Sequence, residues 1–508
     1  MNNNMYYFVN ENIFTFNSGT EFSAMNRQKL FNKYDVNSKI MTRNYNQGLH
    51  QEIRKNGLGD DDIINMYDYF QHVTKVPYHH VKLRYSKMID KRYYKIRGID
   101  NNKSMILLHG HKVATVQIFP STVGEIGNVI YYDDFGNVTS KDIWDARGFK
   151  SKTQYMHPDG QLGHELVYDY HGKPVMEIAH MNINGKLSPT MYKLLDYNGH
   201  NLRFNTEDDL FVFFMQEILK KHPGVLINDR PTLTEPVAKV NNAEKRYQLL
   251  HNVQTTDAKL SGSPKGKLFP ILEQFFHKDM NKYDGIIVST EDQKRDFNKL
   301  FPSLRCYAIP DVALFKDHEK EIQKGLKPVD NDNLIYIGRI AEDKHIDHLI
   351  QIASFVKNKI SDVKLNIVGY FSSPKYQKQL ENQVKKLNLN DVVKFKNYSI
   401  GKQKAKLLSN SKLMLQTSFG EGLSMNLVEG LEYGLPEVAY DVHYGPNRII
   451  KNDVNGYLIP QGNMQEAANK IVRILSDDDL YKQFSKNSLE HAKDFSADNV
   501  MSQWKKLG

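Results

Sequence analysis

The hydrophobic and polar positions follow two different patterns along this chain. An apolar run at 6–9, a polar loop at 10–21 and a segment of helical periodicity at 22–31 open the sequence. A strand, a loop and a helix in this order predict the start of an α/β unit of the kind that binds nucleotides. The α/β pattern returns after Asn205. The elements expected there are a helix at 206–221 and strands at 224–228, 247–250 and 285–289.

Between Val76 and Phe204, short aromatic and β-branched runs alternate with turn signals. From Pro158 onward these signals fall about a dozen residues apart, which predicts an antiparallel β-meander. Stretches beginning at Tyr131, Tyr168 and Leu195 resemble one another. The likeness indicates either a weak repeat of hairpin units or only the shared needs of tight turns.

A second α/β region begins at Leu334, after a polar, lysine-rich stretch that predicts a linker. Strands alternating with helices indicate a parallel sheet, so we expect two doubly wound Rossmann-like domains that face a cleft. Ligands of such domains bind at the carboxyl ends of the strands. The expected boundaries are 1–75 and 205–320 for the N-terminal domain, 76–204 for the inserted β-meander, 321–333 for the linker, 334–490 for the C-terminal domain and 491–508 for a C-terminal helix that packs back on the N-terminal domain.

The composition narrows the class of protein. A chain of 508 residues exceeds one ordinary domain, and 40% hydrophobic with 25% charged residues is typical of globular proteins. The formal net charge of +9 favours an acidic partner or an anionic small ligand, and without an arginine-rich block we expect no nucleic acid. The single cysteine, Cys306, excludes a disulfide framework and a cysteine-based metal cluster.

The chain shows neither a signal-peptide pattern at residues 1–12 nor an apolar run long enough to span a bilayer. We therefore expect a cytoplasmic protein, either free or peripheral at the membrane.

The most specific motif runs from Glu421 to Glu429 and reads Glu-Gly-Leu-Ser-Met-Asn-Leu-Val-Glu. Its two glutamates stand eight positions apart, slightly more than two helical turns, so both carboxylates can line one edge of a cleft. Ser424 is expected to cap a helix whose N–H groups face the ligand that Glu421 holds. Carboxylates accept hydrogen bonds from paired hydroxyls, which suits a sugar or a ribose. The alternative is an ordinary acidic loop followed by a solvated glutamate.

Four further residues are expected at the same cleft. Arg339 and Lys344 lie just past the first strand of the second domain and could neutralise a diphosphate. His251 follows a strand of the first domain at its carboxyl end, and Gly19 in the first loop would allow close approach of the backbone to phosphate. Each residue also has an ordinary interpretation: a solvated cation, a structural histidine or a plain turn.

Together these residues resemble the retaining nucleotide-sugar glycosyltransferases of the group 1 class (family 4), which have the GT-B fold. The segments 440–446 and 455–460 and the β-meander make the chain similar to one branch of that class. This branch holds the bacterial adhesin Ser/Thr N-acetylglucosaminyltransferases and the wall teichoic acid α-N-acetylglucosaminyltransferases. The resemblance spans essentially the whole chain.

Three positions depart from the family pattern. Ser18 stands where many relatives have a second glycine beside Gly19, and Asp343 stands where a glutamate usually precedes the lysine. Glu437 occupies a position where relatives have a small apolar residue at the start of a buried strand. Because an unpaired buried carboxylate is costly, Glu437 is expected to be either exposed or paired.

The resemblance implies UDP-N-acetylglucosamine as the donor, transfer with retention at the anomeric carbon, and no metal or other cofactor. Arg339 and Lys344 would bind the diphosphate and stabilise UDP as it leaves, and Gly19 would let its loop approach the same group. Glu421 would hold hydroxyls of the transferred sugar, which His251 would contact from the opposite domain. The catalytic set is therefore expected to be Glu421, His251, Arg339 and Lys344.

The remaining donor contacts are also implied by the resemblance. Glu429 would hold the ribose hydroxyls, and the loop at Tyr398 would recognise the uracil. Gly422, Leu423 and Ser424 would complete the donor site.

The acceptor stays open between two acidic polymers, and the net charge suits both. Residues 17–26 look closer to the adhesin enzymes, which favours Ser/Thr hydroxyls of an acidic Ser-rich protein with Ser-Asp repeats. The alternative is transfer of N-acetylglucosamine or glucose to a poly(polyol phosphate) chain of wall teichoic acid. A second alternative, a non-catalytic subunit that binds the acceptor, is disfavoured because the donor-site residues are present. The meander is expected either to join a homo-oligomer or a related partner subunit, or to bind the acceptor.

Overall fold

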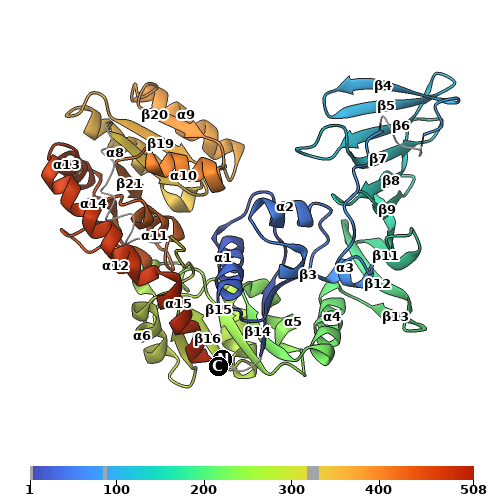
Figure 1. Ribbon diagram of the computed structural model, residues 1–508, viewed down its shortest axis with the longest axis horizontal. Coiled ribbons are helices and arrows are strands. Elements are labelled where there is room, and N and C mark those ends of the chain that lie inside the picture. The colour runs from blue at the N-terminus through green and yellow to red at the C-terminus, as the bar shows by residue number, and fades with distance from the viewer. Residues whose placement is uncertain (1–3, 84–88, 317–330, 508) are drawn as a thin grey trace.

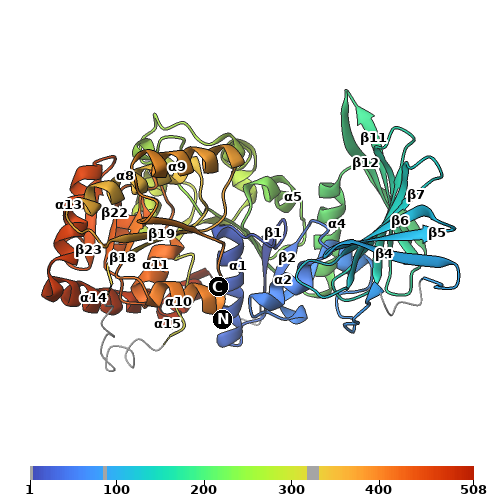
Figure 2. The ribbon, with the colours of Figure 1, turned by 90° about the horizontal axis from the view of Figure 1, so that it is seen from above.

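The computed structural model describes residues 4–83, 89–316 and 331–507. Two α/β domains stand side by side, and a long antiparallel sheet extends from one of them, away from the other (Figure 1 and Figure 2). The predicted linker at 321–333 lies mostly outside the described residues. No helix in the described ranges is both long enough and apolar enough to cross a bilayer.

The N-terminal domain contains a seven-stranded parallel sheet in the order β17-β16-β15-β14-β1-β2-β3. Its central strands consist mainly of apolar residues because helices cover both faces of the sheet. The strands are β1 (Met5–Asn10), β2 (Ser38–Thr42), β3 (Ile63–Asn65), β14 (Gly224–Asn228), β15 (Lys245–Leu249), β16 (Gly285–Val288) and β17 (Cys306–Ala308). The helices are α1 (Gly19–Lys33), α2 (Leu49–Lys55), α3 (Met66–Phe70), α4 (Glu207–Lys221), α5 (Thr234–Ala238) and α6 (Glu291–Leu300).

Helix α1 begins three residues before the start that its periodicity predicted. The Glu21 carboxylate accepts hydrogen bonds from both the backbone N–H and the hydroxyl of Ser18, each at 2.7 Å. This contact fixes the helix start at Gly19, because a side chain that caps the first turn satisfies groups with no partner inside the helix.

The insertion is one ten-stranded antiparallel sheet in which every strand pairs with its neighbours in the chain. Side chains of its later strands, Val167 and Met176 among them, share a core with Phe211 and Phe214 of α4. This shared core attaches the sheet to the N-terminal domain. Its strands are β4 (Tyr94–Asp100), β5 (Lys103–Leu108), β6 (His111–Ile118), β7 (Ile126–Tyr132), β8 (Val138–Trp144), β9 (Lys150–Met156), β10 (Leu162–Tyr168), β11 (Pro174–Ile183), β12 (Lys186–Tyr197) and β13 (His200–Phe204).

The C-terminal domain has a six-stranded parallel sheet in the order β20-β19-β18-β21-β22-β23. The strands are β18 (Asn333–Ile337), β19 (Lys364–Val368), β20 (Val393–Lys396), β21 (Leu413–Gln416), β22 (Glu437–Asp441) and β23 (Gly456–Pro460). The helices are α8 (Ile346–Lys357), α9 (Pro374–Lys386), α10 (Gly401–Ser409), α11 (Met425–Glu432), α12 (Gly445–Ile449), α13 (Met464–Leu475) and α14 (Asp478–Ala492).

After α14 the chain returns to the N-terminal domain through α15 (Ala497–Trp504), which lies beside that domain in Figure 1. Trp504 packs its ring against Phe31 of α1, with centroids 5.7 Å apart. The returning segment is hydrogen-bonded to the outgoing one: Leu314 N–H donates to the Phe495 carbonyl at 2.8 Å, and Ala497 N–H donates to the Leu314 carbonyl at 2.9 Å. The two segments therefore meet in a short parallel bridge.

Glu437 departs from the sequence expectation. Its side chain in β22 is fully buried, and neither carboxylate oxygen has a hydrogen-bond partner among the described residues. The expectation that it is exposed or paired was wrong, because Gly430 of α11 leaves the space that the carboxyl group fills. A Cβ on Gly430 would lie 2.5 Å from Glu437 Oε1. Burial raises the pKa of Glu437 well above its usual value.

Candidate active site

A cavity of about 520 Å³ lies between the two α/β domains. It is bounded by the start of α1 on one side and by loops after β18, β19, β20 and β21 on the other. These loops stand at the carboxyl ends of parallel strands, where doubly wound sheets bind ligands. The predicted residues that line it are Gly19, His251, Arg339, Lys344, Tyr398, Glu421, Ser424 and Glu429.

Lys344 and Glu421 form the centre of the cavity's charged wall. Lys344 Nζ donates to Glu421 Oε1 at 2.6 Å, and both side chains are mostly buried. Gln416 Nε2 donates to the same oxygen at 2.9 Å, while the Ser424 hydroxyl donates to Gln416 Oε1 at 2.5 Å. Thr417 donates its hydroxyl to the Lys344 carbonyl at 3.0 Å, which anchors the lysine's backbone. The lysine is thus held in place by the Glu421 carboxylate.

Glu429 forms a second pair of opposite charges. It accepts from Nζ of Lys404 on α10, and that ammonium also donates to Asn426 Oδ1 at 3.0 Å. All three side chains line the cavity. The Glu-x7-Glu spacing therefore brings both carboxylates to one cavity, as the sequence predicted, although Glu421 precedes α11 and only Glu429 lies within it.

Gly422 and Leu423 do not line the cavity. Leu423 is buried in the core of the C-terminal domain. Gly422 faces the backbone of the other domain: a Cβ there would lie 2.4 Å from the His251 carbonyl oxygen and 3.0 Å from the Asn252 nitrogen. Leu423 therefore packs in the core, and Gly422 allows the two domains to approach each other closely. Neither residue lines the cavity.

Ser424 lines the cavity, but its side chain does not cap α11, contrary to the sequence prediction. Its backbone has φ of 74°, in the left-handed region, and its side chain accepts no hydrogen bond from the first turn of the helix. The hydroxyl instead points to Gln416, which positions the amide that holds Glu421.

His251 is held between two buried carboxylates. Its Nδ1 lies 3.2 Å from Asp311 Oδ2 and its Nε2 lies 3.1 Å from Asp229 Oδ1. Burial lowers the pKa of His251, but the Asp311 and Asp229 carboxylates outweigh burial and raise this pKa to about 8. Arg27 pairs with Asp229 at 2.6 Å and neutralises the second acidic charge. Both ring nitrogens of His251 are therefore engaged by carboxylates.

Arg339 and Tyr398 lie at more exposed parts of the cavity. Arg339 pairs with Asp343 at 2.9 Å, an exposed pair that costs little to break. Asp343, which stands where relatives usually have a glutamate, is thus the ion-pair partner of Arg339. The Tyr398 hydroxyl accepts from the backbone N–H of Asn17 at 3.3 Å, which joins the first loop of one domain to the other domain.

The C-terminal domain is similar to a known protein family. Residues 317–491 match the family model described as glycosyl transferases group 1. We call this segment, which contains the parallel sheet of the C-terminal domain, the group 1 domain. It contains every predicted site residue except Gly19 and His251.

The similarity to individual proteins extends beyond the group 1 domain. The chain is 25% identical to a poly(ribitol-phosphate) α-N-acetylglucosaminyltransferase of Staphylococcus aureus, over 96% of both chains. It is 23% identical to the GtfA subunit of a UDP-N-acetylglucosamine–peptide N-acetylglucosaminyltransferase of Streptococcus agalactiae, over 98% of this chain and 97% of that one. The solved pneumococcal O-GlcNAc transferase GtfA, in complex with UDP and GlcNAc, superposes with a TM-score of 0.84 at 21% identity, over 100% of this chain and 99% of that one. The fold is GT-B, with the antiparallel sheet as an insertion.

Sequence reasoning missed four residues of the site. Lys404 and Gln416 hold the two glutamates of the group 1 domain, and Asp229 and Asp311 hold His251. Asp229 directly follows β14, which is the same signal that singled out His251 after β15. Lys404 carried no signal, because its partner lies 25 positions away in the chain.

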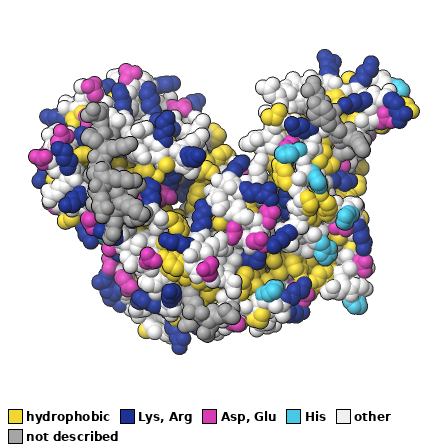
Figure 3. All heavy atoms as spheres, viewed as in Figure 1, with side chains coloured by type: hydrophobic (Ala, Val, Ile, Leu, Met, Phe, Trp, Pro, Cys, Tyr) yellow, Lys and Arg dark blue, Asp and Glu magenta, His cyan; other side chains and the backbone are white. Residues whose placement is uncertain are grey.

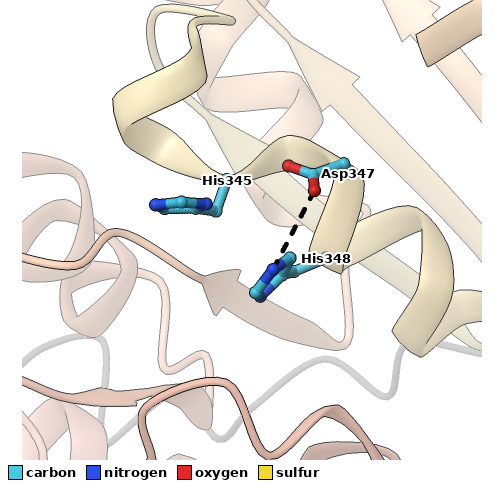
Figure 4. A group of neighbouring side chains, drawn as sticks. All are labelled: His345, Asp347 and His348. Carbon is cyan, nitrogen blue, oxygen red and sulfur yellow. Dashed lines mark ion pairs between the residues drawn. The ribbon is translucent and has the colours of Figure 1, made fainter. Parts of the chain in front are cut away.

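One group of side chains in the described ranges could hold a metal ion, and it lies behind the Lys344 loop. Ligand atoms of His345, Asp347 and His348 all fall within 4.8 Å of one another (Figure 4). His348 Nδ1 lies 2.9 Å from the Tyr440 hydroxyl, and the His345 ring stacks on Phe419. None of the three lines the cavity, so the arrangement assigns them no part in the chemistry there. Metal independence remains a prediction.

Proposed function

We propose that this chain is a retaining glycosyltransferase that moves N-acetylglucosamine from UDP-N-acetylglucosamine to Ser/Thr hydroxyls of an acidic, Ser-rich protein. The Lys344–Glu421 pair in an interdomain cavity carries the proposal. It sets a cation for a diphosphate next to a carboxylate for sugar hydroxyls. The full-length similarity to two enzymes named for N-acetylglucosamine transfer supports this donor.

In this proposal, donor binding exchanges partners within the cavity. The diphosphate takes Lys344 from Glu421 and Arg339 from Asp343, and the released Glu421 carboxylate accepts from hydroxyls of the sugar. As the bond to UDP breaks, negative charge grows on the β-phosphate, and the two cations and the N-terminus of α1 stabilise it. A donor handled by side chains in this way needs no metal. The outcome is retention of the anomeric configuration.

The other domain and the far end of the cavity complete the donor site. Cationic His251 faces the transferred sugar across the cleft. Glu429 holds the ribose once Lys404 yields to the hydroxyls, and the loop at Tyr398 recognises the base.

A second candidate acceptor has its own support. The S. aureus relative is named for poly(ribitol phosphate), and its 25% identity is comparable to that of the peptide-modifying relatives. Transfer to a polyol-phosphate chain is therefore the alternative. In the same way, the solved GtfA/B complex, with a TM-score of 0.76, supports a related partner subunit as a further proposal.

The test is a transfer assay with purified protein in EDTA. UDP-N-acetylglucosamine and UDP-glucose are each offered with a Ser-Asp repeat peptide or with poly(ribitol phosphate), and product mass is measured. Mass added to the peptide supports the proposal. Mass added only to the polymer would show that the acceptor is the polyol-phosphate chain and not the protein. Lys344→Ala should abolish transfer while the unfolding temperature stays within a few degrees. Full activity of this variant would overturn the donor site.

A further inference from the structure

Most of the net charge of the chain is concentrated at one edge of the C-terminal domain. Residues 374–409 contain nine lysines against two acidic residues, a charge of +7, whereas the whole chain carries +9. Lys404 is the one that pairs with Glu429 in the cavity. The other eight are exposed, and we call them the lysine edge: Lys375, Lys378, Lys385, Lys386, Lys394, Lys396, Lys402 and Lys406.

The lysine edge surrounds β20, the outermost strand of the sheet. Val393 belongs to the core on the α9 side, so by alternation along the strand Lys394 and Lys396 point to the opposite face. Helix α10 packs on that opposite face through Leu408, and it carries Lys402 and Lys406 one turn apart. Lysines therefore stand on both faces of the domain edge, and Figure 3 shows Lys and Arg side chains gathered over this part of the molecule.

Within the described ranges, these ammonium groups make few contacts with the rest of the protein, although Lys394 Nζ donates to the Asn390 carbonyl at 2.7 Å. Within the described part of the chain, none of the eight forms an ion pair with a carboxylate, although exposed lysines elsewhere often do, as Lys173 and Lys239 show. Lysines on an edge strand can serve to prevent strand pairing, but that role accounts only for Lys394 and Lys396. The lysines of the two helices need a different explanation.

Two observations indicate which anionic partner fits. No large exposed hydrophobic side chain lies within residues 374–409, so the edge offers nothing to insert into a lipid bilayer. Helix α10 also borders the cavity through Gly401 and Lys404, so a chain bound along the edge can continue into the site. An extended chain with regularly spaced carboxylates meets both conditions.

We propose that the lysine edge is a docking surface for acidic segments of the protein acceptor, outside the catalytic cavity. This inference rests on the proposed function. The edge holds one part of the acceptor while a serine of another part occupies the cavity, so it lowers the KM for long acceptors and leaves the chemical step unchanged.

The test reverses three charges of the edge together, Lys394→Glu, Lys396→Glu and Lys406→Glu. The matched control reverses three exposed lysines elsewhere, Lys278→Glu, Lys451→Glu and Lys486→Glu. Three lost pairs at an exposed surface should raise the KM for a long Ser-Asp repeat peptide about tenfold at low salt. The kcat, the KM for a Ser-Asp tetrapeptide and the affinity for UDP should stay unchanged, as should all four quantities in the control. A long-peptide KM within twofold of the control would overturn the proposal.

Direct binding separates this proposal from the proposed function. Fluorescence anisotropy of the labelled long peptide needs no transfer, and the wild-type protein should bind it more weakly as salt rises. The edge variant should lose most of this binding. Equal binding by both proteins refutes the docking surface even if transfer is observed. Loss of binding in the edge variant supports it even if the donor proves to be another sugar. Binding of poly(ribitol phosphate) or of anionic lipid vesicles through the edge, without binding of the peptide, would overturn the assigned partner.

Discussion

Glu421 and Glu429 should affect UDP binding in opposite directions when each is changed to glutamine. In the unliganded site Glu421 neutralises Lys344 at 2.6 Å, and the side chains are only 13% and 17% exposed. If the diphosphate binds Lys344 as proposed, UDP must break this pair first. Glu421→Gln removes the competing charge, while the amide oxygen still accepts from Gln416 and Lys344.

The size of the effect follows from the burial of the pair. Exposed ion pairs contribute about 0.2–1 kcal/mol and buried ones more, so relief of a mostly buried pair amounts to about 1–2 kcal/mol. UDP should bind Glu421→Gln about five- to thirtyfold more tightly than the wild type, although sugar transfer is lost. Glu429→Gln should instead bind UDP more weakly, because a carboxylate that accepts from the ribose has become an amide.

Calorimetric titration with UDP measures both variants against the wild type at the same salt concentration. Thermal unfolding checks that each variant is folded. An unchanged or weaker UDP affinity in Glu421→Gln would refute the partner exchange at Lys344, and so would a shift of the same sign in both variants.

Three further changes probe the domain contact, the histidine and the buried acid. Gly422→Ala places a methyl group 2.4 Å from the His251 carbonyl oxygen, so it should lower kcat at least tenfold by forcing the domains apart, with UDP affinity nearly unchanged in a calorimetric titration. Asp311→Asn should lower the His251 pKa below its wild-type value of about 8, and NMR titration of both proteins checks this. Because the folded pKa is raised, the stability lost in this variant should be largest below pH 6.5 and should vanish as the pH rises through about 8. Glu437→Gln should become more stable than the wild type as the pH rises above 4.5, with a gap that grows by up to about 1.4 kcal/mol per pH unit, because the folded protein keeps this proton. Parallel unfolding temperatures of the two proteins from pH 5 to 8 would contradict this.

The doubly wound domains could be predicted because strands buried on both faces produce apolar runs that are visible without an alignment. The site loops follow from the same rule, since they stand after the carboxyl ends of those strands. The partners of the site residues could not be predicted. Lys404 meets Glu429 only because α10 and α11 border the same cavity, and Asp311 reaches His251 from a segment 60 residues away.

Predictions from local sequence were wrong at two residues whose side chains meet residues distant in the sequence. Ser424 has the side chain of a helix cap, yet its hydroxyl serves Gln416 and its backbone is left-handed. Glu437 is a carboxylate in a core because Gly430, in a different element, provides the space. Ser424 lies within the glutamate motif, and Glu437 packs against Gly430, the residue that follows the motif.

The bridge between Leu314 and Ser496 has a mechanical consequence. Two interdomain connections that lie far apart resist rotation between the domains. Here the segments at Leu314 and Ser496 are hydrogen-bonded to each other, so they can act as a single pivot. Rotation about this pivot would widen the cleft most at the points farthest from the bridge, and it would break the contacts that join the two domains across the cleft. Two sets of hydrogen bonds join the domains across the cleft. One runs from Asn17 to Tyr398, and the other joins Tyr444 to Gln254 and Asp296. The first of these sets includes one hydrogen bond and the second includes two, so a donor that replaces either with its own hydrogen bonds would also set how far the cleft closes.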